Sequence, residues 1–234
     1  MRRLLVLASA AAAFAAVGVA PAAATNECRG LMVCVPVAGP WVVVPTGGAN
    51  ARPQVEYQLS CPRGYIVGGL DAELTNRAID VAFGGTLGSP VNPGITTSRA
   101  AVFSGRYVGG GAPAPSFRPH IGCIPTTGGG QRVPTALHAF PPGKPTLRRV
   151  RTIRVRSGRT VHTAFGCAPG ERLVAASHAV GFFTVAPPAA RLASAVTVTR
   201  RVQDGRIAVT VGGGSALAGV RAVVQVSALC AGGR

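Results

Sequence analysis

Short segments in which hydrophobic and polar residues alternate recur along the chain, and stretches rich in Gly and Pro separate them. This pattern predicts β-strands joined by turns, because alternation places every second side chain on the same face of a strand. In the first half, strands are predicted at residues 41–44, 54–59, 65–70, 78–83, 97–103 and 117–122. In the second half, they are predicted at residues 147–155, 160–165, 172–178, 195–202, 206–211 and 220–229.

The composition supports this all-β prediction. The 234 residues include 32 Gly and 19 Pro, which argue against long helices. Only 13% of the residues are charged, which argues against a helical bundle or a disordered polyelectrolyte. The hairpin signal is clearest at Gln203-Asp204-Gly205, where two alternating segments flank a glycine that can adopt a positive φ. Evenly spaced short strands of this kind are typical of β-sandwich or jelly-roll-like modules.

The first 24 residues have the features of a secretory signal peptide. Two arginines precede an apolar run from Leu4 to Ala20, and three alanines at 22–24 offer a cleavage site before Thr25. A retained membrane anchor is the weaker alternative, because the run is rich in Ala and is followed by Pro21. No later run approaches the roughly 18–20 apolar residues that span a bilayer. We expect a secreted protein, extracellular or associated with the cell wall, with no transmembrane segment after cleavage.

An even number of cysteines follows the predicted cleavage site. In an exported chain this favours three disulfides. The alternative, a zinc site, lacks a Cys-x-x-Cys pair, and no histidine stands at ligand spacing, so we expect neither a metal nor another cofactor. The six residues are Cys28, Cys34, Cys61, Cys123, Cys167 and Cys230.

An internal repeat suggests how these cysteines pair. Residues 55–64 align with 161–170 at an offset of 106, so that Cys61 matches Cys167, and Cys123 matches Cys230 at an offset of 107. After one inserted residue, 66–69 match 173–176. The simplest scheme joins Cys61 to Cys123, Cys167 to Cys230, and Cys28 to Cys34.

This repeat predicts an all-β protein built as two tandem disulfide-stapled β-sandwich-like modules. The expected divisions are a signal peptide at 1–24, an N-terminal segment with a local disulfide at 25–40, and modules at 41–140 and 141–234. An immunoglobulin domain is not expected, because the single Trp41 precedes Cys61 and no tyrosine lies two residues before the later cysteines.

The segment Cys61-Pro-Arg-Gly-Tyr-Ile-Val-Gly-Gly69, with a closing apolar strand that ends at Cys230-Ala231, resembles a module of secreted actinobacterial proteins of unknown function. The resemblance covers most of each half. The second copy departs from it, with Ala168-Pro169 in place of the Pro and Ala175-Ala176 in place of the Gly pair. It implies secretion and a high-GC bacterial source, which the ratio of 23 Arg to one Lys also suits, and it implies no activity.

Candidate catalytic residues are few. The sequence has no Gly-x-Ser-x-Gly, no His-Glu-x-x-His and no P-loop. Asp71, Glu73 and Asp80 form one acidic group, which would suit an acid–base pair or calcium. However, Asp71 and Glu73 alternate with Leu70 and Leu74, which is typical of the solvent face of a strand, and the second copy has no carboxylates there.

Positive charge is concentrated in the second half. The net charge is +17, or +15 without the leader, and residues 141–234 carry 14 basic against 2 acidic residues. Seven basic residues lie within one 16-residue segment, where no acid intervenes. The candidates for polyanion binding are Lys144, Arg148, Arg149, Arg151, Arg154, Arg156 and Arg159.

We interpret this segment as a strand, because residues 147–150 align with 41–44 at the repeat offset. Thr152, Arg154 and Arg156 would then face water, and Ile153 and Val155 would face the core. A helix that ends near Gly158 is the alternative. The charge has two explanations, namely protection of an exposed edge strand against aggregation and attraction of polyanions.

Three functions remain open. The first is a secreted, non-enzymatic protein that binds anionic cell-wall polymers or glycans through the basic segment. The second is a secreted hydrolase that uses the acidic group, and the third is an extracellular protein-interaction module. Nucleic acid is a less suitable partner, because no aromatic residue lies between Phe140 and Phe165 to stack on a base.

Overall fold

The protein is all-β in a computed structural model that describes residues 25–47, 54–85, 99–111, 113–126 and 146–232. The predicted leader lies outside these residues. The first-half strands are β1 (Val35–Ala38), β2 (Trp41–Val43), β3 (Gln54–Ser60), β4 (Tyr65–Leu74), β5 (Ile79–Gly85), β6 (Ala100–Tyr107) and β7 (Ser116–Pro125). The second-half elements are β8 (Thr146–Val155), β9 (Thr160–Gly166), β10 (Glu171–Phe182), α1 (Ala190–Ala193), β11 (Val196–Gln203), β12 (Arg206–Gly213), the 3-10 turn η2 (Ser215–Leu217) and β13 (Ala222–Gly232).

All twelve predicted strands are confirmed as elements, with some boundaries shifted. The structure adds β1, a four-residue strand that contains Pro36 and was not predicted. The predicted hairpin joins β11 to β12, and Asp204 and Gly205 at its turn both have positive φ, 51° and 70°. Two adjacent residues with positive φ match the right-handed twist of a strand pair.

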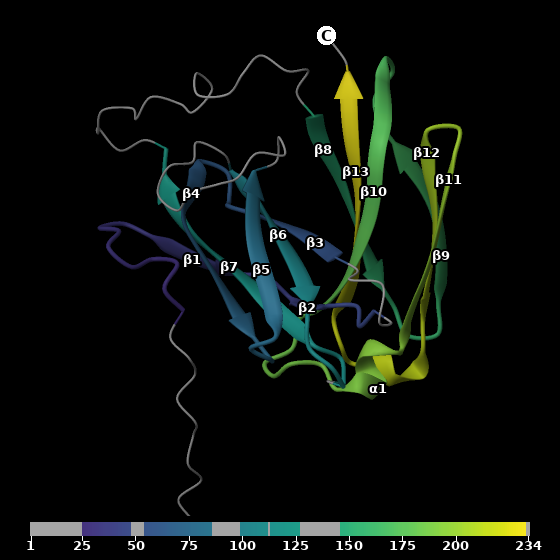
Figure 1. The fold of residues 1–234 in the computed structure, drawn as a ribbon, viewed down its shortest axis with the longest axis horizontal. Helices are drawn as coiled ribbons and strands as arrows, with labels where there is room; N and C mark the ends of the chain where they lie inside the picture. The colour runs from purple at the N-terminus through teal and green to yellow at the C-terminus, as the bar shows by residue number, and fades with distance from the viewer. Residues whose placement is uncertain (1–24, 48–53, 86–98, 112, 127–145, 233–234) are drawn as a thin grey trace, which may run out of the picture.

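The strands form three antiparallel sheets (Figure 1). The large sheet has the order β1-β7-β2-β10-β13-β8, with β4 also paired to β7. Two small sheets have the orders β3-β6-β5 and β11-β12-β9. One core, around Phe103, Phe117 and Ile121, lies between the large sheet and the β3-β6-β5 sheet. A second core, around Phe182 and Ile207, lies between the large sheet and the β11-β12-β9 sheet.

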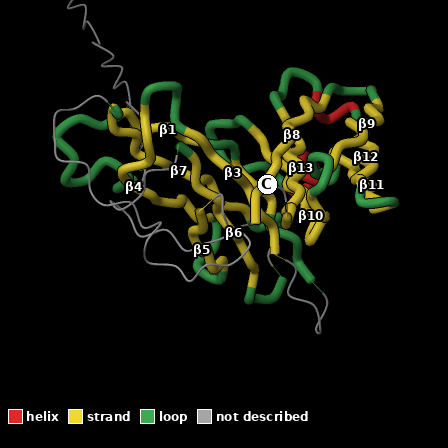
Figure 2. Tube along the Cα trace, turned by 90° about the horizontal axis from the view of Figure 1, so that it is seen from above, coloured by secondary structure: helices red, strands yellow, loops and turns green. Residues whose placement is uncertain are grey.

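The large sheet passes through both halves of the chain. Val42 on β2 faces Phe117 on β7 along one edge and Gly181 on β10 along the other. A reciprocal pair of hydrogen bonds adds to this contact: Gln58 N–H donates to the Gln225 side chain at 2.6 Å, and Gln225 Nε2 donates back to the Gln58 carbonyl at 3.0 Å. The two halves therefore share one sheet, and they lie side by side in Figures 1 and 2.

The three disulfides pair as predicted: Cys28 with Cys34, Cys61 with Cys123, and Cys167 with Cys230. No cysteine of the described chain is free. Each of the two long-range bridges joins the residue that follows a small-sheet strand, β3 or β9, to a strand of the large sheet, β7 or β13, across 62 and 63 residues. Three disulfides indicate that the chain folds in an oxidising environment.

The strand register corrects two details of the predicted repeat. Val67 faces Cys123 and Leu173 faces Cys230, and a register shift follows each, so residues 66–69 match 172–175 without the inserted residue. Leu147 faces Cys230 just as Val35 faces Cys123. The counterpart of residues 147–150 is therefore β1 and not 41–44, so that alignment was wrong although the strand it supported is present.

The N-terminal segment packs over glycines of β4 and β7. A Cβ atom at Gly69 would lie 1.8 Å from the Glu27 carbonyl oxygen, and one at Gly122 would lie 2.1 Å from the same atom. Both distances are far too short for a side chain, so the backbone of the segment occupies the space that these glycines leave. In the second half the counterpart of Gly69 is Ala175, which is exposed. The Gly pair of the first half is thus replaced in the second half, where no segment of the described chain packs over Ala175.

Candidate anion-binding surface

The basic segment lies mainly on β8, and the alternation predicted for it is confirmed. Ile153 and Val155 are buried in the core between the large sheet and the β11-β12-β9 sheet. Thr152, Arg154 and Arg156 are exposed. Within the described chain β8 pairs only with β13, so it is an edge of the large sheet. Lys144 lies outside the described residues.

Arg148 is turned into the contact between the two halves. Its Nη1 donates to Glu56 Oε2 at 2.7 Å and to Ser227 Oγ at 2.6 Å, and its Nη2 donates to Glu56 Oε1 at 3.2 Å. The Arg148 side chain is only 9% exposed, and Glu56 also accepts a hydrogen bond from Ser177 Oγ. A charge that is buried and paired in this way is not available to a polyanion. This burial and pairing argue against the prediction of Arg148 as a binding residue.

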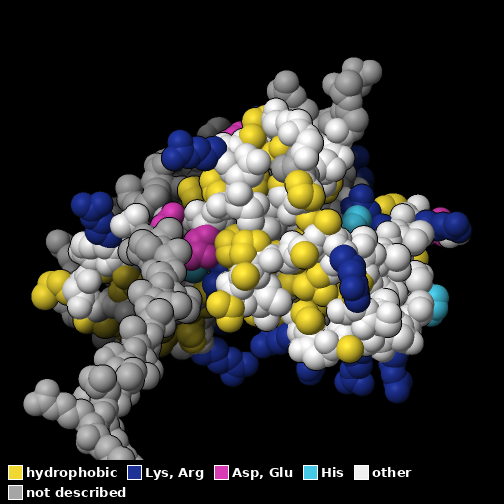
Figure 3. All heavy atoms as spheres, turned by 90° about the horizontal axis from the view of Figure 1, so that it is seen from below, with side chains coloured by type: hydrophobic (Ala, Val, Ile, Leu, Met, Phe, Trp, Pro, Cys, Tyr) yellow, Lys and Arg dark blue, Asp and Glu magenta, His cyan; other side chains and the backbone are white. Residues whose placement is uncertain are grey.

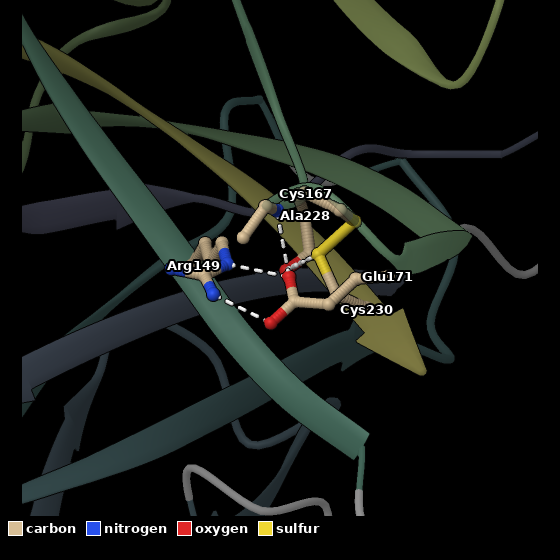
Figure 4. The surroundings of a disulfide bond; sticks show 6 residues. Arg149, Cys167, Glu171, Ala228 and Cys230 are labelled. Carbon is tan, nitrogen blue, oxygen red and sulfur yellow. Dashed lines mark hydrogen bonds and ion pairs between the residues drawn. A yellow bond between two sulfur atoms is a disulfide. The ribbon is translucent and has the colours of Figure 1, made fainter. Parts of the chain in front are cut away.

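Arg149 is neutralised by Glu171, next to the Cys167–Cys230 disulfide (Figure 4). Two hydrogen bonds join the guanidinium to the carboxylate, and Ala168 N–H donates a third to the same carboxylate at 2.7 Å. The side-chain hydrogen bond from Arg149 is the main cause that holds the pKa of Glu171 below its usual value. The same bond raises the pKa of Arg149. This arginine was also predicted as a binding residue, and its charge is already compensated.

The sulfur atoms of Cys167 and Cys230 lie close enough to the Glu171 carboxylate to resemble a ligand set for a metal. Both sulfurs are bonded to each other, however, and a disulfide sulfur is not the thiolate that binds zinc. The arrangement is therefore explained as a disulfide beside an ion pair.

The remaining candidates are Arg151, Arg154, Arg156 and Arg159, all of which are exposed. Arg151 donates one hydrogen bond to the Ala164 carbonyl at 3.2 Å, which leaves its charge uncompensated. Among the described residues, the side chains of Arg154, Arg156 and Arg159 have no hydrogen-bond or ion-pair partner. The basic segment thus separates into two structural arginines and a set of free ones.

A shallow hollow of about 420 Å³ brings two of the free arginines together with a third that the sequence did not single out. Arg154 and Arg156 come from the end of β8, and Arg221 comes from the start of β13. The loop that follows η2 completes the lining with Leu217, Ala218, Gly219 and Val220, and Val155 and Ser157 lie beside the arginines. Three arginines that line one open hollow suit a ligand with phosphate, sulfate or carboxylate groups.

Arg221 is positioned by an aromatic ring. Its guanidinium carbon lies 4.1 Å from the centroid of the Phe183 ring, and Phe183 N–H donates to the Arg221 carbonyl at 2.9 Å. Such stacking holds the guanidinium plane while its N–H groups remain available. Sequence analysis missed Arg221 because it lies 62 residues after Arg159 and outside any run of charge. In Figure 3, Lys and Arg side chains gather along the part of the molecule formed by the second half.

The structure does not bring the acidic group together. Asp71 and Glu73 lie on β4 of the large sheet, whereas Asp80 lies on β5 of a small sheet and pairs with Arg106 at 3.1 Å. Asp71 accepts a hydrogen bond from Asn26 N–H at 2.6 Å. Each carboxylate therefore has a separate local role.

Glu73 is not on a solvent face, which corrects the sequence interpretation. Its Oε2 lies 3.7 Å from Nε2 of the buried His120 and 3.9 Å from Arg118. On the other side of the imidazole, Nδ1 of His120 lies 3.6 Å from Oε1 of Glu27, which is also buried. This row of side chains fastens the N-terminal segment to the large sheet.

Two other histidines differ in their surroundings. His162 is exposed, and its Nδ1 lies 3.0 Å from Thr210 Oγ1. Burial, aided by the positive charge of Arg200, lowers the pKa of His178. Neither histidine belongs to a group of potential metal ligands among the described residues.

No protein-family profile, curated protein or solved structure matches this chain. None of the helices in the described ranges is long and apolar enough to cross a membrane.

Proposed function

We propose that the protein is a secreted, non-enzymatic binding protein that attaches to anionic polymers of the cell envelope, such as wall polymers or glycans. The observation that carries the proposal is the hollow at the end of β8, which is lined by Arg154, Arg156 and Arg221, none of which has a carboxylate partner among the described residues. Arg159 lies three residues after Arg156, directly before β9. Free arginines in one area attract a polyanion, with an affinity that falls as salt displaces the contacts.

The arrangement of the chain supports two tandem β-sandwich-like modules as part of the same proposal. The two small sheets have matching orders, β3-β6-β5 and β9-β12-β11, and each half has one long-range disulfide. A bulge follows the residue opposite the second cysteine in both halves. Because β1 and β2 together match β8, we place the start of the first module at β1 rather than at residue 41.

Retention on an immobilised polyanion tests the binding function. We expect the protein to bind heparin, a sulfated model polymer, at low salt, and we expect the Arg154→Gln, Arg156→Gln double variant to elute at a clearly lower salt concentration. The Arg63→Gln, Arg77→Gln variant is the matched control, because it removes two exposed charges from the first half. Equal retention of the two variants would show that net charge alone governs binding, and the proposal would then fail.

The hydrolase alternative has less support. A pair of carboxylates that act as acid and base must flank one bond of the substrate, and the three acidic residues are engaged in separate contacts. To test it, hydrolytic activity is measured for the purified protein and for a folded Asp71→Asn variant. An activity that this variant lacks would support the hydrolase.

A further inference from the structure

A second exposed feature lies in the first half of the chain, in the loop closed by the Cys28–Cys34 disulfide. Met32 is fully exposed and its neighbour Val33 is 60% exposed. Val35, at the start of β1, is 38% exposed. Most other exposed hydrophobic side chains of the described residues are separated along the chain, whereas these three lie within four positions. We call residues 28–34 the stapled loop.

The stapled loop is constrained at its base, and its apolar tip is exposed. The disulfide closes its base, and the Leu31 N–H donates to the Cys28 carbonyl at 3.2 Å. Leu31 itself is turned inward, toward Gly68 and Ile124. Immediately after the loop, β1 pairs with β7. These constraints reduce the conformational freedom of the tip, which lowers the entropic penalty of binding.

The two charged residues of the N-terminal segment differ in exposure. Its acid, Glu27, is buried and faces His120, whereas its base, Arg29, is exposed beside the tip. An apolar tip with a cation at its base suits the boundary of an anionic bilayer, where apolar side chains enter the acyl region and an arginine meets the headgroups. The net charge of +15 without the leader favours the same partner.

We propose that the stapled loop is a docking site for the surface of an anionic lipid bilayer, with Met32 and Val33 inserted and Arg29 at the level of the phosphates. This surface is distinct from the hollow of Arg154 and Arg156, so either proposal can stand without the other. Two short side chains support weak and reversible attachment only.

The test places a reporter at the tip itself. In the presence of anionic vesicles with brominated acyl chains, we expect the fluorescence of a Met32→Trp variant to be quenched and to shift to the blue. A Val108→Trp variant, which puts the reporter at a 51% exposed valine after β6, should show neither change. Trp41 is present in both variants and its contribution is subtracted with the parent protein.

Binding to the same vesicles supplies the affinities. Val33→Asp should weaken binding by about tenfold or more, because a charged aspartate cannot stay in the acyl region. Arg29→Gln should weaken binding by about fivefold, because it removes the charge that meets the phosphates. Val108→Asp and the Arg63→Gln, Arg77→Gln variant should leave the quenching of the tip reporter unchanged. If the Met32→Trp reporter stays in water, or if Val33→Asp and Val108→Asp bind equally, the proposal is overturned, whatever the result on heparin.

Discussion

Replacing Arg148 with methionine tests the division of the basic segment into structural and free arginines. The change removes three hydrogen bonds to Glu56 and Ser227 and leaves the Glu56 carboxylate with Ser177. Breaking a fully buried ion pair costs about 3–5 kcal/mol, and an exposed pair contributes about 0–1 kcal/mol. Since Glu56 is 24% exposed and keeps one partner, we expect a loss of about 2–3 kcal/mol.

Chemical denaturation with the disulfides intact measures this loss. For a chain of this size it corresponds to a decrease of roughly 5–10 °C in melting temperature. Arg154→Met is the matched control, because Arg154 is exposed and lacks a partner in the described residues, so its stability should change by no more than about 0.5 kcal/mol. A double-mutant cycle of Arg148→Met with Glu56→Gln isolates the coupling between the two side chains.

On immobilised heparin, the variant that loses more stability should lose less retention. Arg148→Met should be retained like the parent protein, whereas Arg154→Met should elute earlier. If Arg148→Met is as stable as Arg154→Met, the Arg148–Glu56 pair does not hold the two halves together. Earlier elution of a folded Arg148→Met protein would return this arginine to the binding surface.

Three further predictions concern stability. Burial, partly opposed by the charge of Arg221, raises the pKa of Tyr57 to about 12. The contribution of Tyr57 to stability should therefore be complete below pH 10 and should fall by about 3 kcal/mol as the pH rises to about 12. The denaturation midpoints of a Tyr57→Phe variant should lack this fall. Replacing Cys28 and Cys34 with alanine should cost about 2 kcal/mol on the chain-entropy model, about half the loss from removing either longer bridge, as equilibrium unfolding would reveal. Gly122→Ala should push the N-terminal segment away and lower stability by about 1–3 kcal/mol, and unchanged thermal unfolding would contradict this close packing.

Local patterns predicted most of the fold. Strand positions follow from alternation and turn residues, which are properties of neighbouring positions, and the cysteine pairing follows from the repeat. The exception is β1: it is short, it contains Pro36, and its pairing with β7 depends on residues more than 80 positions away. The register between paired strands could not be predicted from the sequence either. A shift of the pairing by one residue leaves the alternation within a single strand unchanged.

The candidate site was predicted only in part, for a related reason. A run of arginines looks uniform in the sequence, but the fold gives Arg148 and Arg149 carboxylate partners and leaves Arg154 and Arg156 without any. The partner of Arg148 is 92 residues away, so no local signal distinguishes it from its neighbours. Arg221 joins the hollow only because β13 pairs with β8.

The position of β2 between β7 and β10 also has a consequence for the order of folding. The chain is synthesised from its N-terminus, so β2 is available long before either partner strand exists. Trp41 shows the extreme case, since its Nε1 donates to the carbonyl of Val185, 144 residues later, at 3.4 Å. Contacts between such distant residues form slowly. One edge of β2 can pair with β7 of the first half, but the other must stay unpaired and prone to aggregation until β10 is made and completes the large sheet.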